Sequence, residues 1–151
     1  LPGRTEVRKL RGLLLAADGI AAITLSASAA EAPKNSFDLP AADAAEALLA
    51  QGGWVSVQVL NEAASVCRRK LKLPWPEVHE LLAAVKACCE VVPLSLAAHE
   101  RALHLAERYQ LSLYDALICA SAQEVEAEVL FTEDLQDGLA LGQMRVRNPF
   151  V

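Results

Sequence analysis

The sequence predicts one α/β domain spanning residues 1–151, folded as a three-layer α/β/α sandwich around a central, mostly parallel sheet. Short β-branched apolar runs alternate with longer segments of helical periodicity along most of the chain. Its 151 residues, 54% of them hydrophobic, suit a single domain with one sizeable core. Helical segments of this length can serve as crossover connections, which place helices on both faces of a parallel sheet.

The first expected elements are a helix, a strand and a second helix. Residues 40–53 show apolar residues at helical spacing, and two glycines end the run. The run WVSVQVL (54–60) alternates valine with small or polar residues and predicts a strand. NEAASVCRRK predicts the second helix, with Asn61 as its N-cap. Glu62 is therefore expected in the first turn of a helix that leaves the C-terminal end of a strand.

A helix, a strand and another helix follow. The segment LPWPEVHELLAAVKACC (73–89) predicts an amphipathic helix with proline at its start. CEVVPL (89–94) predicts a short strand that Pro93 ends. LAAHERALHLAERYQ (96–110) predicts a helix, and the residues expected on its apolar side are Leu96, Leu103 and Ala106.

The last expected elements are one helix and two strands. LSLYDALICASAQEVEA (111–127) predicts a more apolar helix, packed against the sheet. EVLFT (128–132) predicts a buried strand, and MRVRNPF (144–150) predicts a final strand at the edge of the sheet. In sheets of this kind, ligands bind beyond the C-terminal ends of the strands.

Composition indicates where the protein works. No apolar run reaches the ~18–20 residues that a membrane-spanning helix needs. The N-terminal segment imitates a secretory signal, with basic residues before an apolar stretch, but the four cysteines suggest no disulfide framework or zinc site. We therefore expect a cytoplasmic protein with buried, reduced thiols and no membrane association. The histidines are expected to have surface or packing roles rather than roles in metal binding or catalysis: His79, His99 and His104.

Charge narrows the classes of partner. A net charge of −5 argues against a protein that coats nucleic acid, but it suits an enzyme whose clustered carboxylates bind a divalent cation. The densest basic cluster after the N-terminal segment is either a solvated helix end or a contact for RNA or an acidic partner; it consists of Arg68, Arg69, Lys70 and Lys72. Neither G-x-G-x-x-G nor a P-loop occurs, which disfavours a nucleotide-binding α/β protein.

Three carboxylates are expected at one edge of the sheet. Glu62 and Asp134 each follow a strand, and Asp115 begins a helix that should pack beside them. Each alone would be an ordinary helix cap or macrodipole partner. Together they repel one another unless a cation neutralises them. Oxygen ligands favour Mg²⁺ or Mn²⁺, and a cation held in this way can polarise a phosphodiester and activate the attacking water.

Four segments resemble the PIN-domain ribonucleases, specifically the VapC-like toxins of bacterial type II toxin–antitoxin pairs. In chain order they are SVQVLNE (56–62), RYQLSLYDALICASA (108–122), LFTEDLQDG (130–138) and RVRNPF (145–150). The resemblance covers residues from about 40 onwards. It implies that Glu62, Asp115 and Asp134 are catalytic residues and ligands for Mg²⁺ or Mn²⁺. It also implies that Thr132 supports the site by hydrogen bonding.

The same resemblance implies an activity and partners. The expected activity is metal-dependent endoribonuclease cleavage, the hydrolysis of RNA phosphodiester bonds by the toxin component of the pair. A cognate antitoxin would hold the enzyme in check by laying a helix in a groove and directing a basic side chain toward the acidic site. A homodimer is the usual state of such toxins.

Residues 1–39 depart from the family pattern. Family members open with a strand that ends in Asp-Thr/Ser-Asn, whose aspartate is a fourth member of the site, and this chain lacks that tripeptide. The nearest candidate is Asp18, after LLLAA, which is either a replacement ligand or a turn aspartate, since Asp-Gly is a common turn dipeptide. Three interpretations stay open: a displaced working site, a degenerate module that binds antitoxin or RNA without cleaving, and an N-terminus altered at the gene level.

Overall fold

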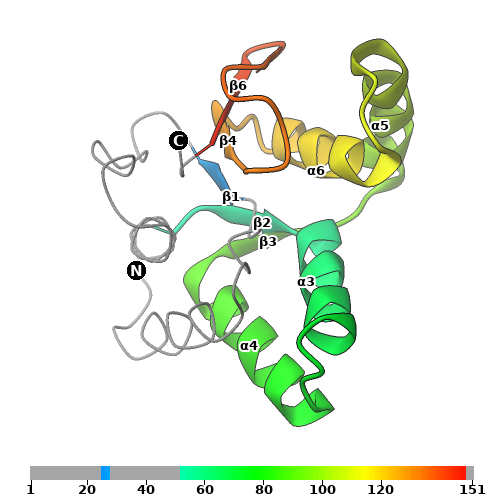
Figure 1. The fold of residues 1–151 in the computed structure, drawn as a ribbon. Helices are drawn as coiled ribbons and strands as arrows, with labels where there is room; N and C mark the ends of the chain where they lie inside the picture. Colours follow the sequence, from blue (N-terminus) through cyan, green and yellow to red (C-terminus); the bar gives the residue numbers. More distant parts are fainter. Residues whose placement is uncertain (1–24, 28–51, 149–151) are drawn as a thin grey trace.

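The computed structural model of the chain describes residues 25–27 and 52–148. This part forms a six-stranded sheet with the strand order β3-β2-β1-β4-β6-β5 (Figure 1). The strands are β1 (Leu25–Ala27), β2 (Trp54–Ser56), β3 (Glu90–Val92), β4 (Val129–Phe131), β5 (Ala140–Leu141) and β6 (Met144–Arg147). The helices are α3 (Val57–Arg69), α4 (Trp75–Cys88), α5 (Leu96–Tyr109) and α6 (Leu113–Glu124).

Four of the strands run in one direction. β2 is parallel to β3 and β4 is parallel to β6, while β2 and β4 are each antiparallel to β1, which lies between them. β5 is antiparallel to β6 and so runs the same way as β1. The predicted α/β fold is confirmed, with β1 and β5 reversed within the otherwise parallel set. The C-terminal ends of β2 and β4 consequently lie at the same edge of the sheet.

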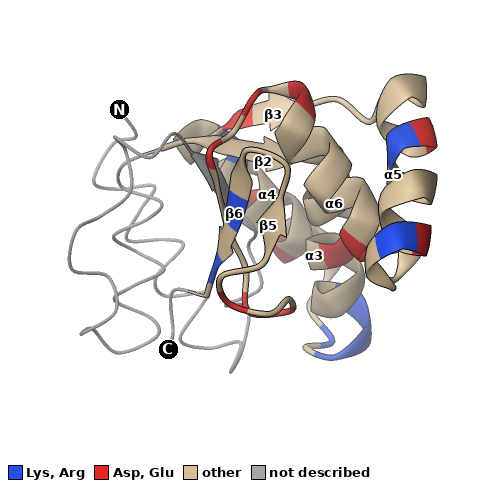
Figure 2. Ribbon diagram, turned by 90° about the horizontal axis from the view of Figure 1, so that it is seen from above, with Lys and Arg blue, Asp and Glu red and all other residues tan. Residues whose placement is uncertain are grey.

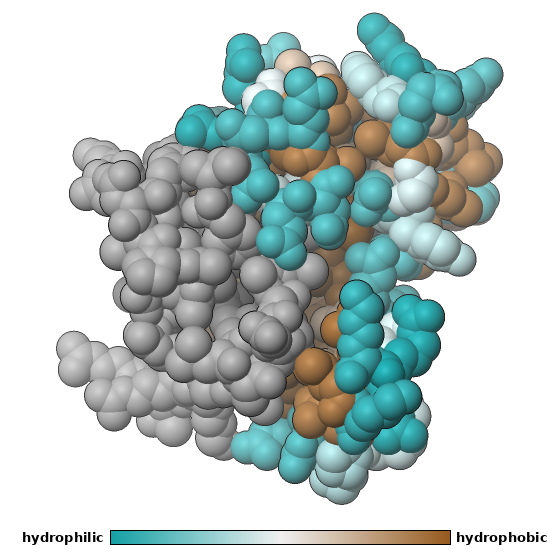
Figure 3. All heavy atoms as spheres, viewed as in Figure 1, coloured by the Kyte–Doolittle hydropathy of each residue, from teal (hydrophilic) through white to brown (hydrophobic). Residues whose placement is uncertain are grey.

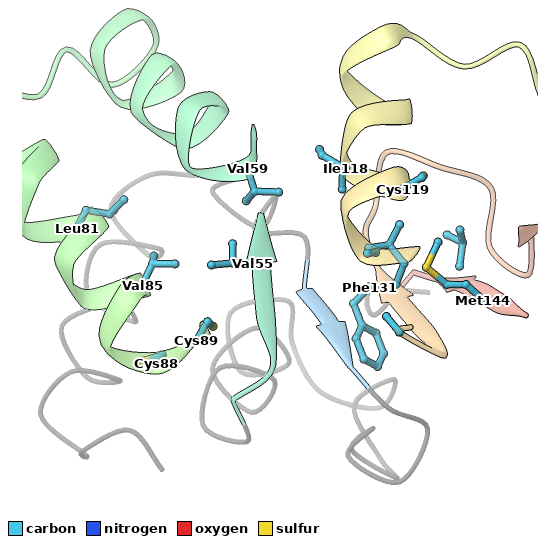
Figure 4. Packing of buried hydrophobic residues seen from close by; sticks show 14 of the residues in the cluster. Val55, Val59, Leu81, Val85, Cys88, Cys89, Ile118, Cys119, Phe131 and Met144 are labelled. Carbon is cyan, nitrogen blue, oxygen red and sulfur yellow. The ribbon is translucent and has the colours of Figure 1, made fainter. Parts of the chain in front are cut away.

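Helices pack on both sides of the sheet. Figure 4 shows Leu81 and Val85 of α4 on one side of β2, and Ile118 and Cys119 of α6 on the other. All four belong to one hydrophobic core, together with Val55 of β2, which is 1% exposed. This arrangement is the three-layer sandwich that the sequence predicts.

The predicted burial of the cysteines is confirmed. The four cysteines are buried and no disulfide joins them. Burial, and then the neighbouring thiol of Cys88, raises the pKa of Cys89 to about 12, so this thiol stays protonated at neutral pH. The three histidines are exposed. None of the helices in the described part of the chain is both long and apolar enough to cross a bilayer.

The segment 54–60, predicted to be a strand, turns into helix after Ser56. Ser56 is the N-cap of α3: its backbone is extended, and its Oγ accepts a hydrogen bond of 3.2 Å from the backbone N–H of Val59. The predicted cap, Asn61, lies inside the helix, and Glu62 lies in the second turn rather than the first. The valines favour a strand locally, but the helix gains the serine cap and buries Val59.

The apolar side predicted for α5 is wrong, although the helix itself forms where the sequence predicts it. Leu96 and Leu103 are 72% and 48% exposed, whereas Ala98 and Ala102 are fully buried against alanines of α6. Ala106 is half-buried against the same cluster. Small side chains let the two helices approach closely, so the size of the residues decides which side of α5 is packed.

The strand β6 is not at the edge of the sheet, contrary to the prediction. It pairs with β4 on one side and β5 on the other, so β5 forms the edge. Leu141 pairs with Met144 across a two-residue turn in which Gly142 has φ 62°, a left-handed conformation that suits glycine. β5 has only two residues, too few to show an alternating pattern in the sequence.

Two predictions concern the N-terminal part of the chain and lie outside the described residues. These are the helix over residues 40–53, except its terminal glycines Gly52 and Gly53, and the placement of Asp18 at the end of a strand. The strand that the structure does describe there, β1, pairs with β4 so that Leu25 aligns with Phe131. The first residue of β1, rather than its last, is therefore at the edge where β4 ends.

The start of α3 can be tested with two alanine variants. Ser56→Ala should lower the free energy of unfolding by about 0.5–2 kcal/mol, because the N–H of Val59 loses its acceptor. Asn61→Ala is the matched control, and it should be neutral or slightly stabilising because alanine is the better helix former. Urea unfolding of both variants measures the difference. A larger loss in Asn61→Ala than in Ser56→Ala would contradict the observed helix start.

Candidate metal-binding active site

Glu62 is held on α3 by a neighbour one turn earlier. The Nε2 of Gln58 donates a hydrogen bond of 3.5 Å to Oε1 of Glu62. Gln58 is 7% exposed, so its amide is fixed by the packing around it, and a spacing of four residues places the two side chains on one side of the helix. Glu62 itself is half-buried. Its carboxylate is therefore oriented by the protein rather than left free in water.

Asp115 lies in the first turn of α6. Ser112 is the N-cap, and its Oγ accepts a hydrogen bond of 3.1 Å from the backbone N–H of Asp115. The helix dipole favours a negative charge at this position, which is a sufficient structural reason for an acidic residue here. The residue is nevertheless half-buried, and its charge acts on carboxylates of two other elements.

The loop that follows β4 presents Asp134. The Oγ1 of Thr132, a buried residue, accepts a hydrogen bond of 3.1 Å from the backbone N–H of Asp134. The backbone N–H of Thr132 donates to the carbonyl oxygen of Arg147 at 3.1 Å, which ties this point of the loop to β6. Thr132 thus fixes the backbone at Asp134, while its part in a metal site stays a prediction.

The far end of the same loop is also tied to β6. Asp137 Oδ1 accepts a hydrogen bond of 2.9 Å from the backbone N–H of Asn148, and it lies 3.7 Å from Nε of Arg147. The backbone N–H of Gly138 donates to the carbonyl oxygen of Val146 at 2.8 Å. With both ends fixed, the loop holds Asp134 in a restricted position at the edge of the sheet.

The three carboxylates act on one another electrostatically. Burial raises the pKa of Glu62, and the negative charges of Asp115 and Asp134 raise it further. The hydrogen bond from Gln58 opposes this rise. Burial and then the charge of Asp115 raise the pKa of Asp134. Figure 2 shows acidic segments where α3 and α6 meet. The carboxylates are thus brought within range of one another, and their role as metal ligands stays a prediction.

The donors at this edge of the sheet suit a hard divalent cation. Cys119 lies one turn after Asp115, but burial and the charge of that aspartate raise the pKa of its thiol to about 12, so it offers no thiolate at neutral pH. Within residues 25–27 and 52–148, no three Asp, Glu, His or Cys side chains come close enough to form a metal cage by themselves. Mg²⁺ needs only one or two carboxylates, with water and substrate phosphate as the other ligands, so an oxygen-only set fits it.

Three residues around the carboxylates escape sequence reasoning. Gln58 falls in a segment predicted to be strand, although its spacing from Glu62 would suggest the pair once the helix start is placed correctly. Glu133 has no assigned role, yet burial and the charge of the next residue raise its pKa. Asp137 gives no signal beyond an Asp-Gly turn dipeptide, because its partners, Arg147 and Asn148, lie ten and eleven residues further along the chain.

Comparison with known proteins identifies the family. The PIN domain family model matches residues 34–136, more than half of the chain. The matched range includes Glu62, Asp115 and Asp134, and β6 follows it. No curated protein matches the sequence. The chain therefore belongs to the PIN domain family, and its fold is of the nuclease type.

Proposed function

We propose that the protein is a metal-dependent endoribonuclease that hydrolyses RNA phosphodiester bonds as the toxin component of a type II toxin–antitoxin pair. The main support is the approach of three carboxylates from α3, α6 and the loop after β4, close enough to raise the pKa of Glu62 and of Asp134. Negative charges held close together repel one another. A bound divalent cation removes this repulsion, so its binding is favoured. Membership of the PIN domain family supports the nuclease class.

Each residue at the sheet edge has a role in this proposal. Glu62, Asp115 and Asp134 would hold Mg²⁺ or Mn²⁺ through carboxylate oxygens. When bound, the cation supplies polarisation of the phosphodiester and a lowered pKa for the attacking water. Gln58 would keep the glutamate oriented, and Thr132 would keep the loop in place. Because these hydrogen bonds already orient the carboxylates, less conformational entropy is lost when the cation binds.

The antitoxin and the cytoplasmic location rest on the resemblance to VapC-like toxins. The acidic site is compatible with inhibition by such a partner. A Lys or Arg side chain directed at the three carboxylates would be attracted by the charges that attract the cation, and it would compete with the cation for them. Inhibition would then need no change in the fold of the nuclease.

A catalytically degenerate module, which binds antitoxin or RNA without cleaving, is the second candidate. It is favoured by the incomplete metal cage among the described residues and by the missing Asp-Thr/Ser-Asn tripeptide. Asp18 would complete the donor set if it took the place of the missing aspartate. Loss of Mn²⁺ affinity in Asp18→Asn would support that replacement, and unchanged affinity would exclude it.

Cleavage of a labelled RNA panel tests the nuclease. Asp134→Asn should lower the rate by roughly 100-fold or more, because an acidic ligand is lost, and EDTA should stop the wild-type reaction. Glu107→Gln is the matched control, since it removes one exposed carboxylate from α5 and should cleave normally. Expression of the wild-type chain, but not of Asp134→Asn, should arrest bacterial growth. Equal cleavage by Asp134→Asn and wild type would refute the assignment.

The pH dependence of stability tests the repulsion between the carboxylates. The folded-state pKa values of Glu62 and Asp134 lie above the ordinary values of 4.5 and 3.8, so the folded protein binds more protons than the unfolded chain. This contribution to stability is complete below the ordinary values and is lost as the pH rises through the raised values. Without divalent cation, Glu62→Gln should therefore be more stable than wild type at neutral pH, and the two should converge in acid.

Thermal unfolding of both proteins between pH 4 and pH 8 would measure this difference. Added Mn²⁺ should raise the melting temperature of the wild type at neutral pH and have less effect on Glu62→Gln. A difference between the two proteins that does not change with pH would show that repulsion at Glu62 is absent.

The exposed side of α5 supports a homodimer. Leu96 and Leu103 are seven residues apart on one side of the helix, and both are exposed. Figure 3 shows apolar side chains at the surface over α5, and such surface favours association. Leu103→Glu should shift the protein to monomer in sedimentation experiments. Ala83→Glu, which adds the same charge to an exposed position of α4, should leave the dimer intact. A dimer that survives Leu103→Glu would place the interface elsewhere.

A further inference from the structure

We propose that the junction of α3 and α4 is a second contact site for single-stranded RNA, in which a base stacks on Trp75 while Arg69, Lys70 and Lys72 contact the phosphates. The proposal rests on the RNA-cleaving function above, and it concerns how the strand is held beyond the carboxylates. Stacking on an aromatic ring beside a basic groove is the usual way in which proteins hold single strands.

Trp75 is exposed where a tryptophan serving only the core would be buried. It is the first residue of α4, and 54% of its surface is accessible to solvent. Trp54, the other tryptophan, is half-buried, and its Nε1 donates a hydrogen bond of 3.1 Å to Glu90. An indole with this much free surface is a ready partner for a flat apolar ligand.

The ring of Trp75 is held in position by a neighbouring side chain. The guanidinium carbon of Arg68 lies 4.5 Å from the ring centroid, and Nη1 of Arg68 donates a hydrogen bond of 2.8 Å to the carbonyl oxygen of Leu73. Arg68 is therefore already engaged by the turn, and it orients the indole through a cation–π contact. A ring fixed in advance loses little conformational freedom when a base stacks on it.

Three cations at the junction of α3 and α4 stay available to a ligand. Arg69, Lys70 and Lys72 are exposed, and none of them pairs with a carboxylate in the part of the chain that the structure describes. The dipole of α3 explains a basic residue in its last turn, such as Arg69, but not Lys72 beyond the helix end. Lys72 has φ 56°, a left-handed conformation that glycine adopts with less strain. A lysine at this position costs stability, which favours a role for its charge.

The basic end of α3 lies beside the acidic edge rather than within it. Glu62 and Arg69 are seven residues apart on one helix, a rise of roughly 10 Å along its axis. Figure 2 shows this order, with acidic segments where α3 meets α6 and basic residues at the end of α3. An RNA strand with one phosphate at the carboxylates can therefore extend along α3 to the cations and the indole. Free cations beside a stacking ring match RNA better than a helical protein partner.

Fluorescence of Trp75 tests this contact directly. The chain has two tryptophans, so Trp54→Phe leaves Trp75 as the single reporter. An oligouridylate of about 10 nucleotides, added in EDTA so that it is not cleaved, should quench this fluorescence. In anisotropy measurements with labelled RNA, Trp75→Ala should weaken binding by roughly 5- to 100-fold, and Trp75→Phe should retain most of the affinity because phenylalanine still stacks.

The variant Lys72→Gly distinguishes the effect of the lysine charge on RNA binding from its effect on stability. It relieves the left-handed backbone, so the free energy of unfolding should stay the same or rise. The affinity for RNA should fall, and the slope of log K against log salt should decrease by about 0.7 because one phosphate contact is lost. Glu107→Gln, on α5, is again the control and should bind RNA as wild type does.

The outcomes distinguish this contact from the nuclease site. In EDTA, where no cation links RNA to the carboxylates, the wild-type protein should bind RNA through this contact without cleaving it. Binding that depends on Trp75 in a wild-type protein that cleaves nothing would refute the nuclease and support this contact. Unquenched fluorescence, or equal affinity of Trp75→Ala and wild type, would overturn the contact. Loss of a protein partner in Trp75→Ala, with RNA binding unchanged, would also overturn it and assign the junction to that partner.

Discussion

The shared direction of β2 and β4 is the constraint on which the acidic edge depends. Both strands are antiparallel to β1 between them, so their C-terminal ends point to one edge. If either strand were reversed, Glu62 and Asp134 would lie at opposite ends of the sheet. The serine caps then set the starting points of α3 and α6, which fix how far each carboxylate stands from the edge. The strand topology therefore determines at which edge of the sheet the carboxylates lie, and the helix caps determine where each carboxylate lies along that edge.

Holding these carboxylates together costs the protein stability, and the surrounding hydrogen bonds maintain the arrangement. Gln58 and Thr132 are both buried, and each makes a hydrogen bond that serves an acidic residue or its loop. At other places the local preferences agree with the fold: small residues where α5 and α6 meet, glycine in the tight turn, and thiols in the core. The carboxylates repel one another, in contrast to these favourable contacts. Function is therefore expected where the carboxylates lie.

Much of the fold could be predicted from the sequence, because burial imposes a visible period. This holds for α4, α6 and β4, each of which places several apolar residues in the core. The sequence-based prediction fails at residues 54–60, where β-branched residues favour a strand but the hydroxyl of Ser56 caps a helix. It also fails for α5, because the packed side depends on the size of residues in α6. At the site, the topology and the family pattern indicate Glu62, Asp115 and Asp134, whereas Asp137 acts through partners that only the folded chain brings near.

The anchorage of the loop by Asp137 makes the last strand part of the mechanical support of Asp134. The carboxylate of Asp137 accepts a hydrogen bond from the backbone of Asn148, and Arg147 lies beside it. A bulky fusion or affinity tag joined shortly after Asn148 would therefore pull on the loop from its far end. Such a fusion would displace Asp134 although every acidic residue is intact. The position of a tag would then change the measured activity as a mutation at the site would.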